Sequence, residues 1–384
     1  MKKKFLKINA FLHLWLGLLS GLVVFILGLT GCILAFQQEI EDVMEPWRRV
    51  VQDVTYHDSP KEMARVLLDS LPDSDIATVK YLGRDRSVAI DFEHQGKRKT
   101  AFIDPYERSI LKIKAQTTGF FPVVLHLHIR LLLPGKVGHG IISYATVIYI
   151  ILLLGGLILW WPKKWNKRQL KNALSLKWKA GAKRVNYDLH NVFGFYSLLP
   201  SLIIACTGIF ISLSWFTKSV YWISSGGQPL PVREAPLSKA TGKTLIDPLL
   251  AVDSVWHLLG KEKQRSTYAL NFILPKKSTD VVTVTDNPNP ATAHLAVIRH
   301  VDRYSFQFIP MPHYWQKDTE LANTGDWIGR YNYDVHVGRI GGLPGKFLAF
   351  IISAICTSLP ITGFLIWYNK KWGKKKAKGV SIRF

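Results

Sequence analysis

Four long stretches of the sequence contain no Asp, Glu, Lys or Arg, and they constrain the fold more than any other feature. They are rich in apolar residues and cover positions 8–36, 137–162, 189–217 and 347–369. A transmembrane helix needs about 20 such residues to cross a hydrocarbon core of about 30 Å. The sequence therefore predicts four transmembrane helices and excludes a wholly soluble protein.

The positive charge of the chain is concentrated beside these stretches. The formal net charge is +23, and 20 basic residues lie in three segments without any acidic residue: the N-terminal arm, residues 163–184 and the tail after Asn369. Lys and Arg in short loops beside membrane spans mark the cytoplasmic side. The charge thus reflects membrane topology rather than nucleic-acid binding. It predicts that both termini and the middle loop are cytoplasmic, with the two longer segments on the outer side.

The two halves of the chain resemble each other, which indicates a duplication. Matching residues recur at spacings that rise gradually from 177 to about 210: His13 with His190, Gly17 with Gly194, Thr30-Gly31 with Thr207-Gly208, Asp104 and Tyr106 with Asp302 and Tyr304, Leu133–Lys136 with Leu343–Lys346, and Gly156–Trp160 with Gly363–Trp367. Small insertions after a duplication produce such a drift, whereas chance matches would scatter. Both halves run in the same direction, so the sequence predicts two parallel span–domain–span repeats.

The two outer segments have the pattern of α+β domains. Ser59-Pro60 and Asp247-Pro248 each combine a capping residue with proline at the first helical position, which predicts a helix start, and Gly260 is expected to close the second helix. Alternating residues at 87–92 and 280–285 predict strands. The predicted fold is a membrane all-α four-helix transmembrane bundle with two α+β outer domains. Its parts are 1–36 cytoplasmic arm and span one, 37–136 first outer domain, 137–162 span two, 163–188 basic loop, 189–217 span three, 218–344 second outer domain, 345–369 span four, and 370–384 basic tail.

Six of the twelve histidines lie at or near predicted span ends, where an ionisable residue is a functional-site candidate. Two lie at cytoplasmic ends and four near outer ends: His13 and His190, then His126, His128, His139 and His336. A pseudo-twofold axis would bring His13 and His190 together near the inner face, and His336 towards its span-two counterpart near the outer face. Two facing imidazoles are what six-coordinate haem iron requires. Small residues leave room for a flat macrocycle at Gly17, Gly31, Gly194 and Gly208.

The partner of His336 stays open at this point. The Leu-Pro-Gly-Lys match selects His126, the Gly-to-Trp match falls nearer His128, and His139 has no repeat counterpart. Each histidine taken alone is also compatible with an interfacial or helix-packing role. The remaining histidines, His57 among them, lack metal-ligand spacing and are expected to be surface or structural residues.

These residues resemble the PepSY-associated transmembrane helix family, whose members include bacterial inner-membrane reductases of imported ferric siderophores. The resemblance runs from Lys2 to Trp372 and is carried by ordered motifs: His13 with Gly17, Thr30-Gly31, Leu127-His128 with Leu131, Gly155–Pro162, His336 with Gly338-Arg339, and Thr362-Gly363. It implies four spans, PepSY-like periplasmic domains, and b-type haem iron held by span histidines. The matching positions are His13, His128, His190 and His336. The additional His126 and the presence of His139 depart from the pattern.

The resemblance implies electron transfer through haem to a ferric siderophore in the periplasm, with release of iron as Fe(II). Because a porphyrin covers only part of a core of about 30 Å, one ligand pair near each face predicts a relay of two haem b groups per chain. One-electron transfer requires no catalytic nucleophile or acid–base pair, and the sequence predicts none. The electron donor is open among quinol, a reduced flavin and a cytoplasmic reductase.

The segment before span four is a candidate docking surface for the ferric chelate. It is aromatic and polar, with Trp315, Trp327, Arg330 and Tyr331. An interfacial aromatic belt is the alternative interpretation of the same residues.

Two other hypotheses cover the whole chain. In the first, the protein is a non-redox PepSY binding or regulatory membrane module whose histidines are packing residues. In the second it is a small-molecule transporter, since Pro200 and Pro360 interrupt spans three and four. The four charge-free stretches carry no acidic or basic side chain of the kind that ion coupling usually needs, which disfavours the transporter.

Overall fold

The computed structural model describes residues 2–52, 58–116, 118–162, 166–239, 244–260 and 268–372. Part of the predicted basic loop (163–165), the predicted tail beyond Trp372 and His57 lie outside these ranges. The chain divides into two compact units. The helical unit contains residues 1–35, 124–213 and 344–384, and the sheet unit contains residues 36–123 and 214–343.

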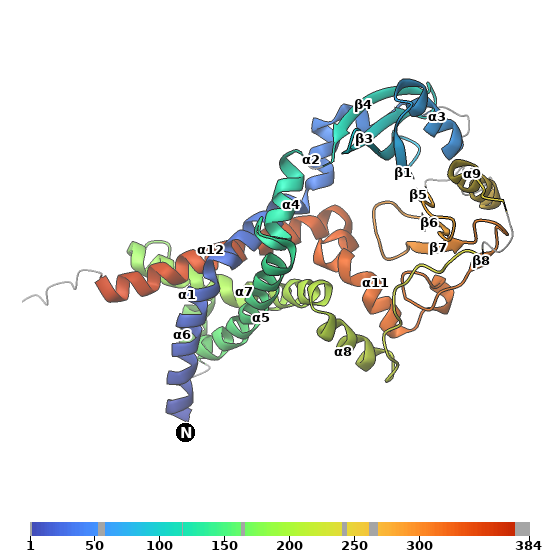
Figure 1. The fold of residues 1–384 in the computed structure, drawn as a ribbon. Coiled ribbons are helices and arrows are strands. Elements are labelled where there is room, and N and C mark those ends of the chain that lie inside the picture. The colour runs from blue at the N-terminus through green and yellow to red at the C-terminus, as the bar shows by residue number, and fades with distance from the viewer. Residues whose placement is uncertain are drawn as a thin grey trace, which may run out of the picture. The chain divides into compact units, whose positions relative to one another are not determined.

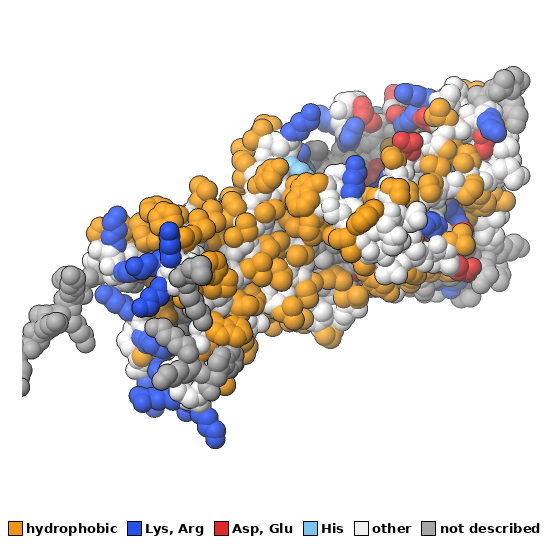
Figure 2. Space-filling view, turned by 90° about the horizontal axis from the view of Figure 1, so that it is seen from below, with side chains coloured by type: hydrophobic (Ala, Val, Ile, Leu, Met, Phe, Trp, Pro, Cys, Tyr) orange, Lys and Arg blue, Asp and Glu red, His pale blue; other side chains and the backbone are white. Residues whose placement is uncertain are grey.

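Four helices of the described chain are long and apolar enough to cross a membrane, which confirms the four predicted spans. They are α1 (Lys2–Ala35), α5 (Gly135–Trp160), α7 (Ala182–Ser212) and α12 (Gly342–Trp372). Large apolar side chains are exposed along all four, and Figure 2 shows this surface with Lys and Arg gathered at one end of the unit. Such a surface is typical of helices that face lipid, where every backbone polar group is satisfied within the helix.

The end of the third span differs from the prediction for a local reason. It lies at Ser212 instead of Thr217, because Leu213 has the extended angles φ −117° and ψ 103° and the chain restarts as α8 (Ser214–Ser224). His126 and His128 lie on a short helix before span two, α4 (Phe120–Arg130), which was not predicted as a separate element. A tight turn joins α4 to α5, and a side chain at Gly138 would overlap the Arg130 carbonyl there.

A small polar cluster connects three spans inside the helical unit. Tyr149 of α5 donates from its hydroxyl to Cys356 Sγ of α12 at 3.0 Å, and Ser201 Oγ of α7 lies 3.2 Å from the same sulfur. Polar side chains that bond across helices stabilise membrane bundles, because lipid offers no alternative partner. The cluster therefore helps to fix the mutual position of α5, α7 and α12.

The sheet unit contains one antiparallel sheet, in which eight strands of the described chain have the order β4-β3-β2-β1-β5-β6-β7-β8 (Figure 1). The strands are β1 (Asp75–Tyr81), β2 (Val88–His94), β3 (Lys97–Asp104), β4 (Ser109–Ala115), β5 (Ala269–Ile273), β6 (Val282–Asn287), β7 (Val297–Val301) and β8 (Phe308–Ile309). Strands β2 and β6 confirm the two predicted strand segments. The outer segments of the two halves meet at β1 and β5, where Val79 pairs with Phe272. They therefore share one continuous sheet.

Both predicted helix starts of the sheet unit are confirmed. Ser59 accepts from Glu62 N while the Glu62 side chain accepts from Ser59 N, so a capping box opens α3 (Pro60–Ser70). Asp247 accepts from two main-chain N–H groups and opens α9 (Pro248–Leu258), which ends just before Gly260 at φ +78°. The unit also contains α2 (Gln37–Met44), α11 (Thr324–His336) and the 3-10 turns Pro46–Arg48, Thr319–Leu321 and Arg339–Gly341, while α6 (Lys167–Leu174) belongs to the helical unit.

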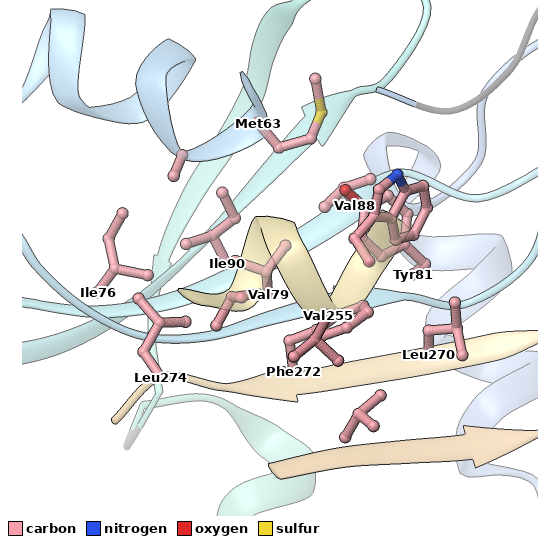
Figure 3. Packing of buried hydrophobic residues seen from close by; sticks show 14 of the residues in the cluster. Met63, Ile76, Val79, Tyr81, Val88, Ile90, Val255, Leu270, Phe272 and Leu274 are labelled. Atoms are coloured by element: carbon pink, nitrogen blue, oxygen red, sulfur yellow. The ribbon is translucent and has the colours of Figure 1, made fainter. Parts of the chain in front are cut away.

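One hydrophobic core joins α3 and α9 to the sheet. Met63 of α3 and Val255 of α9 pack with Val79 and Phe272 of the central strands, as Figure 3 shows. The Tyr81 ring stacks on Trp256 of α9 with ring centres 4.7 Å apart, and its hydroxyl donates to the Asp58 carbonyl at 2.7 Å. Residues from both halves thus contribute to the same core, so the sheet unit is expected to unfold as one cooperative body.

His313 makes the stability of the sheet unit depend on pH. It is buried, and its Nδ1 accepts from Trp315 N at 3.2 Å, so the ring is held neutral. Burial, helped by Arg233 and Arg330 and opposed by Asp326, lowers the pKa of His313 to about 4 from 6.5. Between these values only the unfolded chain binds the proton, so stability is complete above pH 6.5 and falls as the pH drops towards 4.

We expect His313→Asn to reduce this acid sensitivity, because asparagine keeps an acceptor and does not titrate. The difference in unfolding free energy between wild type and variant should change by about 1–3 kcal/mol from pH 7 to pH 4. Tryptophan fluorescence during thermal unfolding of the full chain in detergent measures it. Parallel pH profiles for the two proteins would contradict the assignment.

Candidate functional site

His13 and His190 come together inside the helical unit. His13 projects from α1 and His190 from α7, and their ring centres are 6.4 Å apart with the ring planes at 88°. Both helices place a glycine four residues later, Gly17 and Gly194, so no side chain follows on the same face. The predicted approach of the two rings is found, while their role as ligands stays a prediction.

A cavity of about 410 Å³ surrounds the two rings. All four spanning helices line it, and Trp160 and Phe195 form a stacked aromatic pair on its wall with ring centres 3.8 Å apart. Pockets for cofactors and small molecules have volumes of roughly 300–1,000 Å³ and mainly apolar walls. The cavity is therefore large enough to belong to this class, and its two imidazoles are its main polar groups capable of binding a metal.

Two glycines allow the helices to approach the rings closely. A Cβ added at Gly156 of α5 would lie 3.2 Å from His13 Cε1, and one at Gly363 of α12 would lie 3.1 Å from His190 Cε1. Both contacts are tighter than ordinary van der Waals packing. Larger residues at these positions would push the rings out of place, so the glycines set the position of each imidazole.

The tautomer of His190 is fixed by a threonine of the neighbouring span. Thr362 Oγ1 lies 2.9 Å from His190 Nδ1, and its own hydrogen is directed to the carbonyls of Ser358 (2.9 Å) and Leu359 (3.1 Å). The hydroxyl therefore accepts from Nδ1–H. This leaves the Nε2 lone pair of His190 available as a ligand.

His128 has the same arrangement at another level of the bundle. Thr30 Oγ1 of α1 lies 2.8 Å from His128 Nδ1, and its hydrogen is directed to the Ile26 carbonyl at 2.6 Å. A Cβ at Gly31 would lie 3.8 Å from His128 Cε1. His128 therefore shares with His190 a threonine acceptor and a nearby glycine.

The other candidate histidines have different surroundings. His139, in the first turn of α5, uses Nε2 in a 3.1 Å hydrogen bond with the Ser212 carbonyl at the end of α7. That nitrogen is engaged by the helix terminus. His126 is half-buried on α4, two residues before His128. His336 ends α11 in the sheet unit, and its pairing with a span-two histidine stays a prediction.

One of the four predicted docking residues, Arg330, is buried in the sheet unit, and the other three lie close to it. Arg330 of α11 is fully buried and donates to the carbonyls of His294, Ala296 and Lys317 at 2.6–3.1 Å. Its guanidinium also lies 5.8 Å from the Trp315 ring centre and 5.9 Å from that of Trp327. Arg330 thus ties a loop to α11. The half-buried aromatic residues around it, including Tyr331, which stacks on His294 at 4.3 Å, keep some accessible surface.

Several residues that position these groups were not predicted as site residues. They are Thr30 and Thr362, which bond histidines, Asn9 and Asn186, which bond main-chain carbonyls beside the rings, and Asp334, which accepts from His294 Nδ1 at 2.7 Å. Thr30-Gly31 and Thr362-Gly363 were both visible as Thr-Gly motifs in the sequence. The contact of each motif with a histidine depends on helix rotation, which sequence spacing alone does not specify.

No cluster of three or more His, Cys, Asp or Glu side chains suited to a bare metal ion occurs among the described residues.

A protein-family model matches nearly the whole chain. A search of curated proteins found no match. The family model described as "PepSY-associated TM region" matches residues 10–370. Together with the four spanning helices, this match shows that the chain belongs to the PepSY-associated transmembrane family.

Proposed function

We propose that this protein is a haem-b-binding oxidoreductase of the bacterial inner membrane that reduces Fe(III)–siderophore complexes at the periplasmic face. The observation that carries the proposal is the pair His13 and His190, which lies in an apolar cavity between four spanning helices. Ionisable side chains inside a membrane bundle are energetically costly and rare, and where they occur they usually mark a functional site. Haem bound there would supply one-electron redox chemistry.

The two rings are close enough to bind one metal together, with ring centres 6.4 Å apart. Two imidazoles alone would leave a bare ion under-coordinated, whereas a haem would bring further nitrogen ligands of its own. The residues present therefore fit haem better than a free metal ion.

Four side chains would hold and orient the group at this inner site. His13 and His190 would supply the imidazole ligands, and the Thr362 hydroxyl keeps His190 in the tautomer with Nε2 unprotonated. A hydrogen bond to the other nitrogen of a ligand imidazole fixes the ring orientation and raises its basicity. Tyr149 and the surrounding apolar side chains would exclude water, which lowers the local dielectric.

We propose His128 of α4 as one ligand of a second, outer haem. Its Thr30 bond repeats the arrangement of His190 with Thr362, and neither His126 nor His139 has a comparable threonine partner in the described chain. His336 is the opposite ligand that the family resemblance implies. Two haem b groups per chain, one towards each face, would then form a transmembrane relay.

The proposal includes two parallel repeats with PepSY-like periplasmic domains. Support comes from matched turns: Asp104 Oδ1 accepts from Tyr106 N at 2.8 Å, and Asp302 Oδ1 accepts from Tyr304 N at 3.0 Å. The strand order of the sheet is also the same when read outwards from β1 and from β5. The basic segments orient both termini towards the cytoplasm and the sheet unit towards the periplasm.

The substrate class follows from the family resemblance and from the chemistry of iron. Fe(III) is held tightly by hard oxygen donors, and its reduction to Fe(II) weakens that hold and releases the metal. The half-buried aromatic side chains Trp315, Trp327 and Tyr331 are the proposed docking surface. The donor of electrons is quinol, reduced flavin or a cytoplasmic reductase, and no nucleic acid takes part.

Visible spectra of the full chain purified in detergent test this function. We expect a sharp reduced α-band, about two b-haems per chain by pyridine haemochrome assay, and reoxidation by a hydroxamate or catecholate ferric siderophore with Fe(II) trapped by a ferrous chelator. A colourless protein after expression with ample haem would favour the non-redox binding module. A haem protein that no ferric chelate reoxidises would refute the substrate while leaving the haem site intact.

A further inference from the structure

The two sides of the inner site are built alike in their main-chain contacts. Asn9 Nδ2 of α1 donates to the Gly155 carbonyl of α5 at 2.9 Å, and Asn186 Nδ2 of α7 donates to the Thr362 carbonyl of α12 at 3.0 Å. Each asparagine lies four residues before its histidine. The equivalent positions on α5 and α12 are therefore residues 155 and 362.

The surroundings of the two rings are alike as well. His13 has the main chain of Leu152 beside it and Gly156 against its Cε1, and His190 has Leu359 and Gly363 in the same places. Every one of these α5 and α12 pairs is separated by 207 residues in the sequence. A difference between His13 and His190 in their surroundings is therefore to be sought at positions where the α5 residue and its α12 equivalent are not the same amino acid.

Residues 155 and 362 are such a break, because one is glycine and the other is threonine. The Thr362 hydroxyl accepts from His190 Nδ1 at 2.9 Å. Gly155 offers no hydroxyl to His13, whose buried Nδ1 has only the main chain of α5 near it. A side-chain hydroxyl thus fixes the tautomer of His190, whereas His13 lacks such a partner in the described chain.

We infer that the inner site is asymmetric, with His190 as the permanent axial ligand and His13 as a displaceable one that yields its position to a small neutral ligand. This inference rests on the proposed haem function. A hydrogen bond from Nδ1–H strengthens the metal–imidazole bond, and loss of such an outer partner typically costs about 10–100-fold in metal affinity. The side of His13 is therefore where the site opens, and carbon monoxide is a suitable probe of that opening.

Histidine variants of the full chain test which ligand is permanent. His13→Ala should keep the inner haem, held by His190, with a high-spin spectrum and carbon monoxide binding increased at least 10-fold over wild type. His190→Ala should lose the inner haem. Equal retention or equal loss of haem in the two variants overturns the inference. The absence of haem from wild type would refute both the proposed function and this inference.

A reciprocal pair of variants tests the cause of the asymmetry. Thr362→Val removes the hydroxyl and should raise carbon monoxide binding about 10-fold or more, with Thr362→Ser as the control that retains it. Gly155→Ser supplies the missing acceptor to His13 and should lower carbon monoxide binding by a similar factor. The Asn9 amide must shift for this residue, as Asn186 already accommodates Thr362. Carbon monoxide binding that changes in neither variant, while haem content is normal, overturns the role of residues 155 and 362.

Discussion

Replacing His190 with alanine is expected to remove about half of the haem bound by the protein. His190 combines a fixed tautomer, a hydrogen bond of 2.9 Å to Thr362 and a position opposite His13 in the cavity, so no neighbouring side chain can take over its role. The loss of an axial imidazole removes the strongest protein contact of the inner haem. The remaining haem should keep a low-spin reduced spectrum, because its proposed ligands His128 and His336 are unchanged.

Variants of the outer histidines give this experiment its matched controls. His128→Ala should remove the other half of the haem, whereas His126→Ala, two residues away on the same helix, should remove none. Haem content by pyridine haemochrome and reduced-minus-oxidised spectra measure both. If His190→Ala loses all haem or none, the model of two independent sites is wrong. If His126→Ala behaves like His128→Ala, the threonine bond is not what distinguishes the two residues.

The spans and the inner histidine pair could be predicted because each depends on a signal that the sequence carries directly. Absence of charge over more than 20 residues identifies a span whatever the neighbours are. The repeat at a spacing of 177 residues relates His13 to His190 without any knowledge of helix rotation. The structure then brings their ring centres to 6.4 Å.

Other features depended on contacts between distant segments, which no local pattern specifies. The pairing of β1 with β5 joins residues about 190 positions apart, and it turns two predicted outer segments into one sheet. The helix α4 was not predicted, because its 11 residues are too few to span a membrane and carry no capping signal. The two threonines that bond histidines needed the rotation of each span about its axis, which only packing determines.

The role of Arg330 also could not be predicted from the sequence. An aromatic and cationic segment near a membrane is compatible with a docking surface or an interfacial belt, and sequence composition cannot separate the two. Burial of Arg330 and its three carbonyl partners indicate a structural role for the guanidinium. The sharpest test is a substitution that keeps the charge and changes the geometry.

Arg330→Lys is expected to destabilise the sheet unit strongly, by about 3–5 kcal/mol, because one ammonium cannot reach carbonyls that a planar guanidinium satisfies together. For a unit of this size each kcal/mol lowers Tm by about 2–4 °C, so a fall of roughly 10 °C should be visible by tryptophan fluorescence. Arg299→Lys is the matched control. Arg299 is partly exposed and pairs with Asp318 at 2.7 Å, so its replacement should cost less than about 1 kcal/mol.

The two interpretations of Arg330 predict opposite patterns in the same pair of measurements. If the guanidinium ties the main chain at His294, Ala296 and Lys317 to α11, the variant has a lower Tm than the wild type. Any loss of ferric-chelate affinity then disappears at temperatures where the sheet unit is folded. If the guanidinium instead binds the chelate, Tm stays at the wild-type value while the Kd for the chelate rises. The buried hydrogen bonds at 2.6–3.1 Å favour the first pattern, because the guanidinium is fully buried and three of its five N–H donors already bond main-chain carbonyls. Docking would then depend on the aromatic side chains that Arg330 supports, and Trp327→Ala should lower chelate affinity with a smaller change in Tm.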